Sequence, residues 1–112
     1  MTKRMTKPMA DPMTEFSGRD PGLLVLISLA AGPKHGHAIF LDVADFAGLR
    51  LGPGTLYGAL ARLEESGLIE PLQMDGRRRP YRLTQAGAAD LRGRLTGLGA
   101  AVRVGLRRIE AT

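Results

Sequence analysis

The chain has 112 residues, no cysteine, and a formal net charge of +5 from 16 Lys and Arg against 11 Asp and Glu. This length allows one small domain, and the lack of cysteine excludes disulfide frameworks, thiol chemistry and cysteine-based zinc sites. The charge is uneven, because residues 77–112 contain nine arginines against Asp90 and Glu110. An arginine-rich segment behind a more acidic body indicates a polyanionic partner, with nucleic acid ahead of a membrane surface.

Residues 1–19 are predicted to form a disordered tail, because Pro8 and Pro12 interrupt any helix and apolar content is low apart from methionine. The methionines recur every four residues, so a helical binding face is the alternative. No apolar stretch follows the N-terminal cations, and the apolar run from Leu23 to Ala31 is too short to span a bilayer. We therefore expect a soluble, cytoplasmic protein.

The first helix is predicted to start at Asp20, a favourable N-cap, with Pro21 in the first helical position, and to end before Gly32-Pro33. It is apolar nearly all round. Such a helix needs cover on more than one side, from the core and from a second subunit.

The second helix is expected from about Gly36 to Ala47, with Gly48 as its stop and a very short strand at residues 49–51. Its helically spaced apolar residues predict a buried face, which comprises Ile39, Phe40, Val43 and Phe46.

The third helix opens at Gly52-Pro53 and ends near Gly67. One face is expected to enter the core through Leu56, Ala59, Leu60 and Leu63. The opposite face is small and polar for about two turns, so another molecule can approach it closely.

A hairpin follows, with strands predicted at 68–74 and 77–83 around the Asp75-Gly76 turn; Pro71 favours an edge strand. Thr84 is then expected to cap a last helix that runs to about Ile109. One continuous apolar seam follows this helix, formed by Leu91, Leu95, Leu98, Val102, Leu106 and Ile109.

The seam could pack on the chain's own core, but a helix of this length projects past a three-helix body. Its glycines each cost up to ~1 kcal/mol relative to alanine in an isolated helix, so a partner is needed. We predict an isologous dimer in which the first and last helices are exchanged across the axis. The predicted interface residues are Leu23, Leu26, Ile27 and the six residues of the seam.

Three helices followed by a hairpin, mainly α with a small β component, is the order of a winged helix-turn-helix. In that architecture the third helix enters the major groove and the hairpin wing touches the backbone or minor groove. The expected division is a tail at 1–19, a DNA-binding domain at 20–84 and a dimerisation helix at 85–112. No cofactor or metal is expected, since His35 and His37 have no further ligands that sequence can identify.

Three stretches resemble the PadR-type transcriptional regulators, named for phenolic acid decarboxylase regulation. Residues 54–69 (GTLYGALARLEESGLI) are similar to the family's recognition-helix signature. Residues 32–36 (GPKHG) resemble its Gly-Pro-x-His-Gly turn, and residues 76–87 (GRRRPYRLTQAG) resemble its wing. The resemblance covers about residues 22–110. It implies a homodimeric, usually autoregulatory winged-helix repressor of the short-chain subfamily, whose C-terminal helix supplies the dimer contact.

The chain departs from the family pattern in two places. His37 stands where an aromatic residue is common, and the chain contains no tryptophan. Some family members hold flat aromatic drugs in a dimer pore with a tryptophan of the last helix. This chain lacks that tryptophan, so that mode of ligand recognition is not expected. The resemblance still implies release by an effector, either a small molecule at the dimer interface or another kind.

The predicted DNA-contacting residues lie before the second helix, on the exposed face of the third helix and on the wing. They are Lys34, His35, Gly54, Thr55, Tyr57, Gly58, Arg62, Arg77, Arg78 and Arg79. Arginine is the commonest reader of guanine and a good phosphate ligand, which favours Arg62 for base contact and the wing arginines for the backbone.

Each group has an alternative interpretation. Arg62 could instead pair with Glu65, Tyr57 could pack half in the core, and His35 could stabilise the turn. The predicted function is a sequence-specific double-stranded DNA-binding regulator that acts on a palindromic operator. The alternative is a winged-helix protein-interaction adaptor. An enzyme is not expected, because no nucleophile–base pair, phosphate loop or metal set is present in the sequence.

Overall fold

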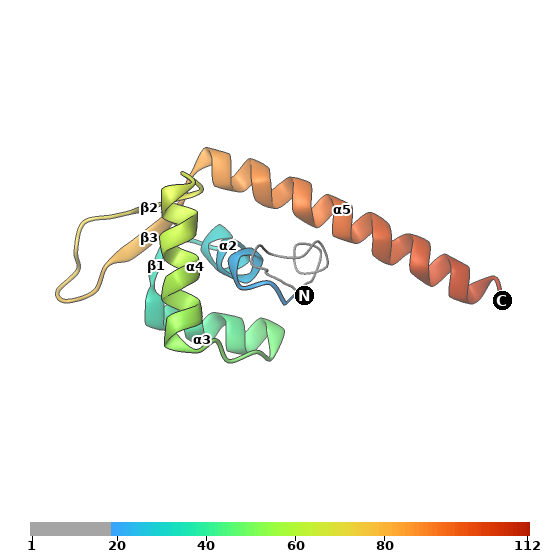
Figure 1. The fold of residues 1–112 in the computed structure, drawn as a ribbon, viewed down its shortest axis with the longest axis horizontal. Helices are drawn as coiled ribbons and strands as arrows, with labels where there is room; N and C mark the ends of the chain where they lie inside the picture. The colour runs from blue at the N-terminus through green and yellow to red at the C-terminus, as the bar shows by residue number, and fades with distance from the viewer. Residues whose placement is uncertain (1–18) are drawn as a thin grey trace, which may run out of the picture.

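The computed structural model describes residues 19–112, so the expectation for the N-terminal tail lies almost wholly outside the described residues. Within residues 19–112, four helices and three short strands follow one another along the chain (Figure 1). In order they are α2 (Pro21–Ala30), β1 (Lys34–His35), α3 (Gly36–Ala47), α4 (Pro53–Glu65), β2 (Ile69–Pro71), β3 (Pro80–Leu83) and α5 (Gln85–Glu110).

Helix α2 is the centre of the core, and it packs against α3, α4, α5 and β3. Its start is as predicted: the carboxylate of Asp20 accepts a hydrogen bond from the Leu23 N–H at 3.0 Å, and Pro21 follows the cap. Leu23 and Leu26 are 1% and 0% exposed. The core of the same chain thus covers Leu23 and Leu26 on all sides, so neither side chain is accessible to a second subunit, contrary to the prediction. Ile27 is only half-buried.

Helix α3 has the predicted bounds and ends where Gly48 adopts a left-handed conformation (φ 65°). Ile39 and Val43 are fully buried, and Phe40 packs partly against the core. The prediction for Phe46 is wrong, because this side chain is 42% exposed. It lies near the end of α3, about one turn past Val43.

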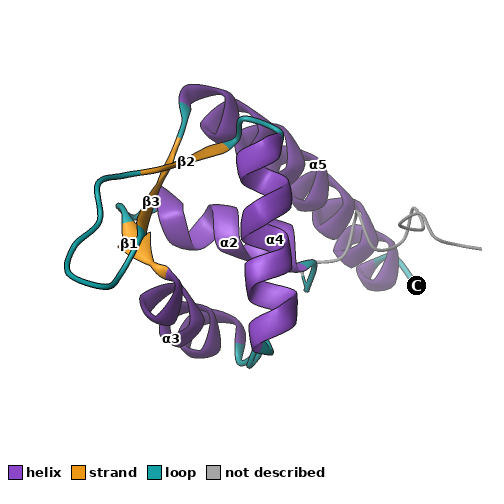
Figure 2. Ribbon diagram, turned by 60° about the vertical axis from the view of Figure 1, so that its left-hand side comes forward, coloured by secondary structure: helices purple, strands orange, loops and turns teal. Residues whose placement is uncertain are grey.

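Helix α4 lies across α2 and buries the predicted apolar face of Leu56, Ala59, Leu60 and Leu63. Pro53 follows the N-cap Gly52, and after Ser66 the chain turns at Gly67, whose φ is +77°. The two neighbouring helices α3 and α4 form the helix-turn-helix pair (Figure 2).

The sheet is antiparallel with the strand order β1-β3-β2. The strand predicted at residues 49–51 is wrong, and the third strand is instead Lys34–His35, which pairs with Tyr81 and Pro80. The alternation of apolar and polar residues at 49–51 has another cause, because Leu51 is buried in the core and Arg50 is exposed.

Strands β2 and β3 are shorter than predicted, and residues 72–79 form a long loop between them (Figures 1 and 2). The loop remains a hairpin, because the backbones of Asp75 and Arg78 exchange hydrogen bonds of 2.8 and 3.0 Å around Gly76. Pro71 stands on an edge strand, as predicted. We call residues 69–83 the wing.

Helix α5 starts where predicted, since the Thr84 hydroxyl oxygen accepts a hydrogen bond from the Gly87 N–H at 3.0 Å. It then projects away from the other elements (Figure 1). The radius of gyration is 16.1 Å, against about 13 Å for a compact domain of this size. The architecture is therefore the expected winged helix-turn-helix with a C-terminal helix, whereas the division at residue 84 into a DNA-binding and a dimerisation part stays a prediction.

Candidate nucleic-acid interface

The exposed face of α4 has few bulky side chains. Gly54, Thr55 and Arg62 are exposed, and Gly58 is half-buried beside them. Arg62 makes no ion pair within residues 19–112, so the alternative of a pair with Glu65 is not what this structure shows. Its guanidinium instead extends back over Gly58, where a β-carbon would lie 3.6 Å from Nη1. The face is therefore open, with a free cation near its centre.

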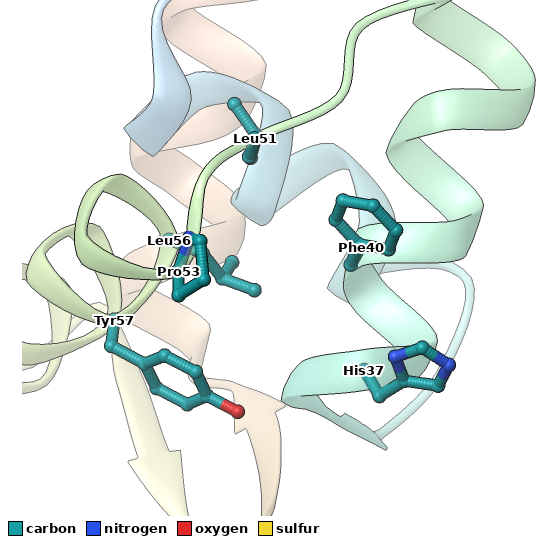
Figure 3. A pocket seen from close by; sticks show the side chains of 6 residues that line it. All are labelled: His37, Phe40, Leu51, Pro53, Leu56 and Tyr57. Atoms are coloured by element: carbon teal, nitrogen blue, oxygen red, sulfur yellow. The ribbon is translucent and has the colours of Figure 1, made fainter.

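Tyr57 is not a core residue, because it is 54% exposed. Its ring lies against the start of α3: a β-carbon on Gly36 would be 2.6 Å from the Tyr57 hydroxyl oxygen. Figure 3 shows the hydroxyl directed from α4 toward His37. The side chain thus bridges the two helices and keeps its polar end at the surface.

An apolar pocket of about 280 Å³ lies between α3 and α4 behind this bridge (Figure 3). Its walls are His37, Phe40, Leu51, Pro53, Leu56 and Tyr57. The His37 and Phe40 rings stack with centroids 6.0 Å apart, and the Arg50 guanidinium lies 5.9 Å from the Phe40 centroid. The sequence does not predict this pocket, because Leu51 and Pro53 meet His37 and Phe40 only through the packing of α3 against α4.

The three wing arginines are all exposed but differ in their contacts. Arg79 Nη1 donates a hydrogen bond to the Leu72 carbonyl oxygen at 2.6 Å and so ties the two sides of the wing together. Arg78 Nη1 lies 3.0 Å from Nε2 of His35. Arg77 makes no hydrogen bond or ion pair with residues 19–112. Arg77 is therefore the one of the three that is fully available to a partner.

Lys34 and His35 both have structural contacts. The Lys34 ammonium donates to the carbonyl oxygens of Ser28 at 2.5 Å and Gly32 at 3.2 Å, at the end of α2. Carbonyls in the last turn of a helix have no partner within the helix, so this cation caps α2. His35 is the N-cap of α3, with Nδ1 accepting from the Ala38 N–H at 3.3 Å. The contacts support the turn-stabilising interpretation of His35.

A second pocket, of about 360 Å³, opens between the wing and the start of α3. It is lined by His35, Gly36, His37, Tyr57, Arg77, Arg78, Arg79 and Tyr81. Burial raises the pKa of the Tyr81 phenol above its ordinary value; the Glu64 carboxylate adds to this effect and Arg79 opposes it. Tyr81 is therefore a neutral hydroxyl at physiological pH, and the charge of the pocket lining is positive.

Three carboxylates of the described chain are paired with arginine. Glu70 forms an ion pair with Arg82 across β2 and β3, and Arg94 on α5 lies 2.9 Å from Asp90 and 3.7 Å from Asp20. Among residues 19–112, no three His, Cys, Asp or Glu side chains are grouped so as to hold a metal ion.

The second candidate surface is the outer half of α5. Leu91 is buried against the body and Leu98 is partly covered, but Leu95, Val102, Leu106 and Ile109 are 42–70% exposed. No helix of the described part of the chain is long and apolar enough to cross a membrane.

Comparison with known proteins decides the family. Residues 24–93 match the PadR-like family of transcriptional regulators. The chain belongs to this family. The transcriptional regulator Rv3488 of Mycobacterium tuberculosis is 42% identical over 82 residues, which cover 70% of the chain and 76% of Rv3488. As a PadR-like protein, the chain is a transcriptional regulator and not an enzyme.

A second relative is an uncharacterised 37.1 kDa protein of transposon Tn4556 from Streptomyces fradiae, 56% identical over 68 residues. The match covers 61% of the chain, which spans only 20% of that longer protein. Two PadR family crystal structures show the same fold. One, from Clostridium difficile, has a TM-score of 0.72 at 23% identity and covers 80% of this chain and 97% of its own. The other, from Eggerthella lenta, has a TM-score of 0.64 at 29% identity and covers 81% and 84%.

Proposed function

We propose that this PadR-like regulator binds double-stranded DNA sequence-specifically as a dimeric repressor. The observation that carries the proposal is that Tyr57 of α4 and the three wing arginines line one pocket of about 360 Å³, while Thr55 and Arg62 of the same helix are exposed. In this arrangement α4 enters the major groove and the wing follows the adjacent backbone.

The contacts divide the predicted site residues into two groups. Thr55 and Arg62, over the small surface of Gly54 and Gly58, face the base edges, where arginine pairs with guanine. Arg77, Arg78 and Tyr57 face phosphates. Lys34 has a structural role instead, because its ammonium donates a hydrogen bond to the Ser28 carbonyl oxygen at the end of α2.

The dimer is formed through α5. Its exposed apolar residues form one stripe on a helix of 26 residues, about 39 Å long at 1.5 Å per residue. A stripe of this kind is covered when a second copy packs its own α5 against it, with Ile27 of α2 at the margin. The two recognition helices then meet half-sites one helical turn apart, so the operator is a rough palindrome.

Repression follows where an occupied operator overlaps a promoter, in the cytoplasm where the chromosome is accessible. Release requires an effector with different affinities for the free and DNA-bound dimer. We place the site for a small-molecule effector at the dimer interface, near the junction of α2 and α5.

Selection of bound fragments from random duplex DNA, followed by sequencing, tests the proposal. The expected result is a palindromic motif whose affinity exceeds that of scrambled duplex by at least ~10³ at physiological salt. Equal affinity for all sequences at every salt concentration would contradict it and favour the protein-interaction adaptor. In that case substitutions in the α5 stripe would impair function, while Thr55→Ala and Arg62→Ala would not.

A further inference from the structure

His35 has two neighbours that it cannot satisfy together. Its Nδ1 accepts a hydrogen bond from the Ala38 N–H at 3.3 Å, and its Nε2 lies 3.0 Å from Nη1 of Arg78. A neutral imidazole has one acceptor nitrogen and one N–H, and an imidazolium has no acceptor. Both neighbours are donors. In every protonation state, at most one of the two contacts is a hydrogen bond.

Of the two possible hydrogen bonds to the acceptor nitrogen of His35, the bond from the Ala38 N–H is the more costly to lose. The Ala38 N–H belongs to the first turn of α3, where backbone N–H groups have no partner within the helix, and it is half-buried. Leaving such a donor unpaired is costly. Arg78 is exposed, so water can solvate its guanidinium at no comparable penalty. The cap therefore fixes the tautomer with its proton on Nε2.

With its proton on Nε2, His35 places a hydrogen-bond donor next to the Arg78 guanidinium, which is also a donor, and no acceptor lies between the two groups. The Nε2–H of His35 and the guanidinium of Arg78 meet at the wall of the pocket of about 360 Å³, which is also lined by Tyr57 and Arg77. None of the residues that line this pocket is acidic. An oxyanion that enters there accepts from both donors and relieves their mutual repulsion.

We propose that His35 and Arg78 form a phosphate-binding site between the start of α3 and the wing, in which the hydrogen bond from the Ala38 N–H to Nδ1 leaves Nε2–H of His35 as the donor. Where the phosphate belongs to a DNA backbone, this inference rests on the proposed function and assigns one of its phosphate contacts. His35 then contributes a directed hydrogen bond, and Arg78 contributes a hydrogen bond and the charge.

The tautomer is tested by NMR on the full ¹⁵N-labelled chain, with His37 as the internal control. Long-range ¹⁵N–¹H spectra at neutral pH are expected to show His35 protonated on Nε2, and a proton on Nδ1 would overturn the inference. Inorganic phosphate and a DNA duplex are then added separately. If the His35 ¹⁵N chemical shifts change on addition of either inorganic phosphate or duplex, the site is a general phosphate site. If they change with duplex alone, the site is a contact to the DNA backbone. No shift with either, or an equal shift in Arg78→Gln, contradicts the site.

Binding to a duplex provides the second test. His35→Asn keeps a favoured N-cap but removes the Nε2 donor, so the melting temperature is expected to stay near that of the wild type. The affinity is expected to fall about 3- to 10-fold, the effect of one hydrogen bond, with an unchanged salt dependence because no charge is lost. Wild-type affinity in His35→Asn would overturn the inference.

A double-mutant cycle provides the control. His35→Asn added to Arg78→Gln is expected to cause little further loss, because the two donors share one acceptor. His35→Asn added to Arg77→Gln is expected to cause the full loss of affinity seen in the single His35→Asn variant, since the hydrogen-bond distance of 3.0 Å joins His35 to Arg78 and not to Arg77. If the wild-type chain binds no duplex at all, the proposed function fails, and the inorganic phosphate titration still decides whether the site exists.

Discussion

Tyr57 rests on the backbone of Gly36, at the point where α4 crosses the start of α3. A β-carbon at position 36 would lie 2.6 Å from the Tyr57 hydroxyl oxygen and 3.0 Å from its Cζ. Real β-carbons essentially never approach other heavy atoms within 3.0 Å. The absence of a side chain at Gly36 therefore allows the phenol to lie in its observed position, between the two pockets beside α4.

Gly36→Ala is accordingly expected to displace Tyr57 without unfolding the protein. Tyr57 is 54% exposed and can rotate away, and alanine favours a helix over glycine by up to ~1 kcal/mol. We expect a melting temperature within a few degrees of the wild type and a loss of duplex affinity of about 3- to 10-fold, the effect of one phosphate hydrogen bond. Fluorescence anisotropy with the selected operator measures the loss.

The control for this variant is Tyr57→Ala. Since Gly36→Ala acts only through the phenol, adding it to Tyr57→Ala should cause no further loss of affinity. An additional loss in the double variant would mean that position 36 itself contacts DNA. Unchanged affinity in both single variants would remove Tyr57 from the interface.

At Gly87 the close neighbour is backbone, and not a movable side chain as at Gly36. A β-carbon there would lie 2.0 Å from the Leu68 carbonyl oxygen, and backbone atoms cannot move aside as a side chain can. Gly87→Ala is expected to destabilise the fold by about 1–3 kcal/mol, the usual penalty for overpacking. Gly93→Ala, on the same helix with nothing within 4 Å, is expected to be neutral or to stabilise by up to ~1 kcal/mol. Thermal unfolding of both variants measures the difference, and equal melting temperatures would contradict the close approach.

The helices were predictable because the signals that start them are local. Asp20-Pro21, Gly52-Pro53 and Thr84 each act within one turn of chain, and all three stand at helix starts in the structure. The third strand was not predictable. Lys34–His35 is too short for a pattern, and it is a strand only because β3, more than 40 residues later, pairs with it.

The candidate site shows the same limit. Sequence reasoning placed Arg77, Arg78 and Arg79 together on the wing, but treated them as equivalent. Their differences arise from contacts across the wing and between the wing and α3, such as Arg79 with the Leu72 carbonyl. Similarly, Phe46 has helical spacing for burial, but its side chain is 42% exposed. Periodicity specifies a face, whereas only the fold specifies what covers it.

The α5 stripe makes a prediction about assembly. Val102→Asp places a charge on a 57% exposed apolar position of the stripe and is expected to shift the protein from dimer to monomer, with duplex affinity reduced at least ~100-fold through the lost second half-site. Ala100→Asp, on the opposite side of the same helix, is the matched control and should remain dimeric. Light scattering after gel filtration measures the mass, and a dimeric Val102→Asp protein would locate the interface elsewhere.

The wing arginines make the last prediction, which separates electrostatic from structural roles. Arg77 makes no hydrogen bond or ion pair within the described chain, so Arg77→Gln is expected to leave the melting temperature unchanged. It should weaken binding to all duplex sequences alike and reduce the slope of log affinity against log salt by about one. Arg79→Gln removes the 2.6 Å hydrogen bond to the Leu72 carbonyl, and is expected to loosen the wing and lower duplex affinity further at the selected operator than at random sequence. Titrations at four salt concentrations with both duplexes distinguish the two variants. Identical behaviour of Arg77→Gln and Arg79→Gln would show that the bond to Leu72 does not order the wing for recognition.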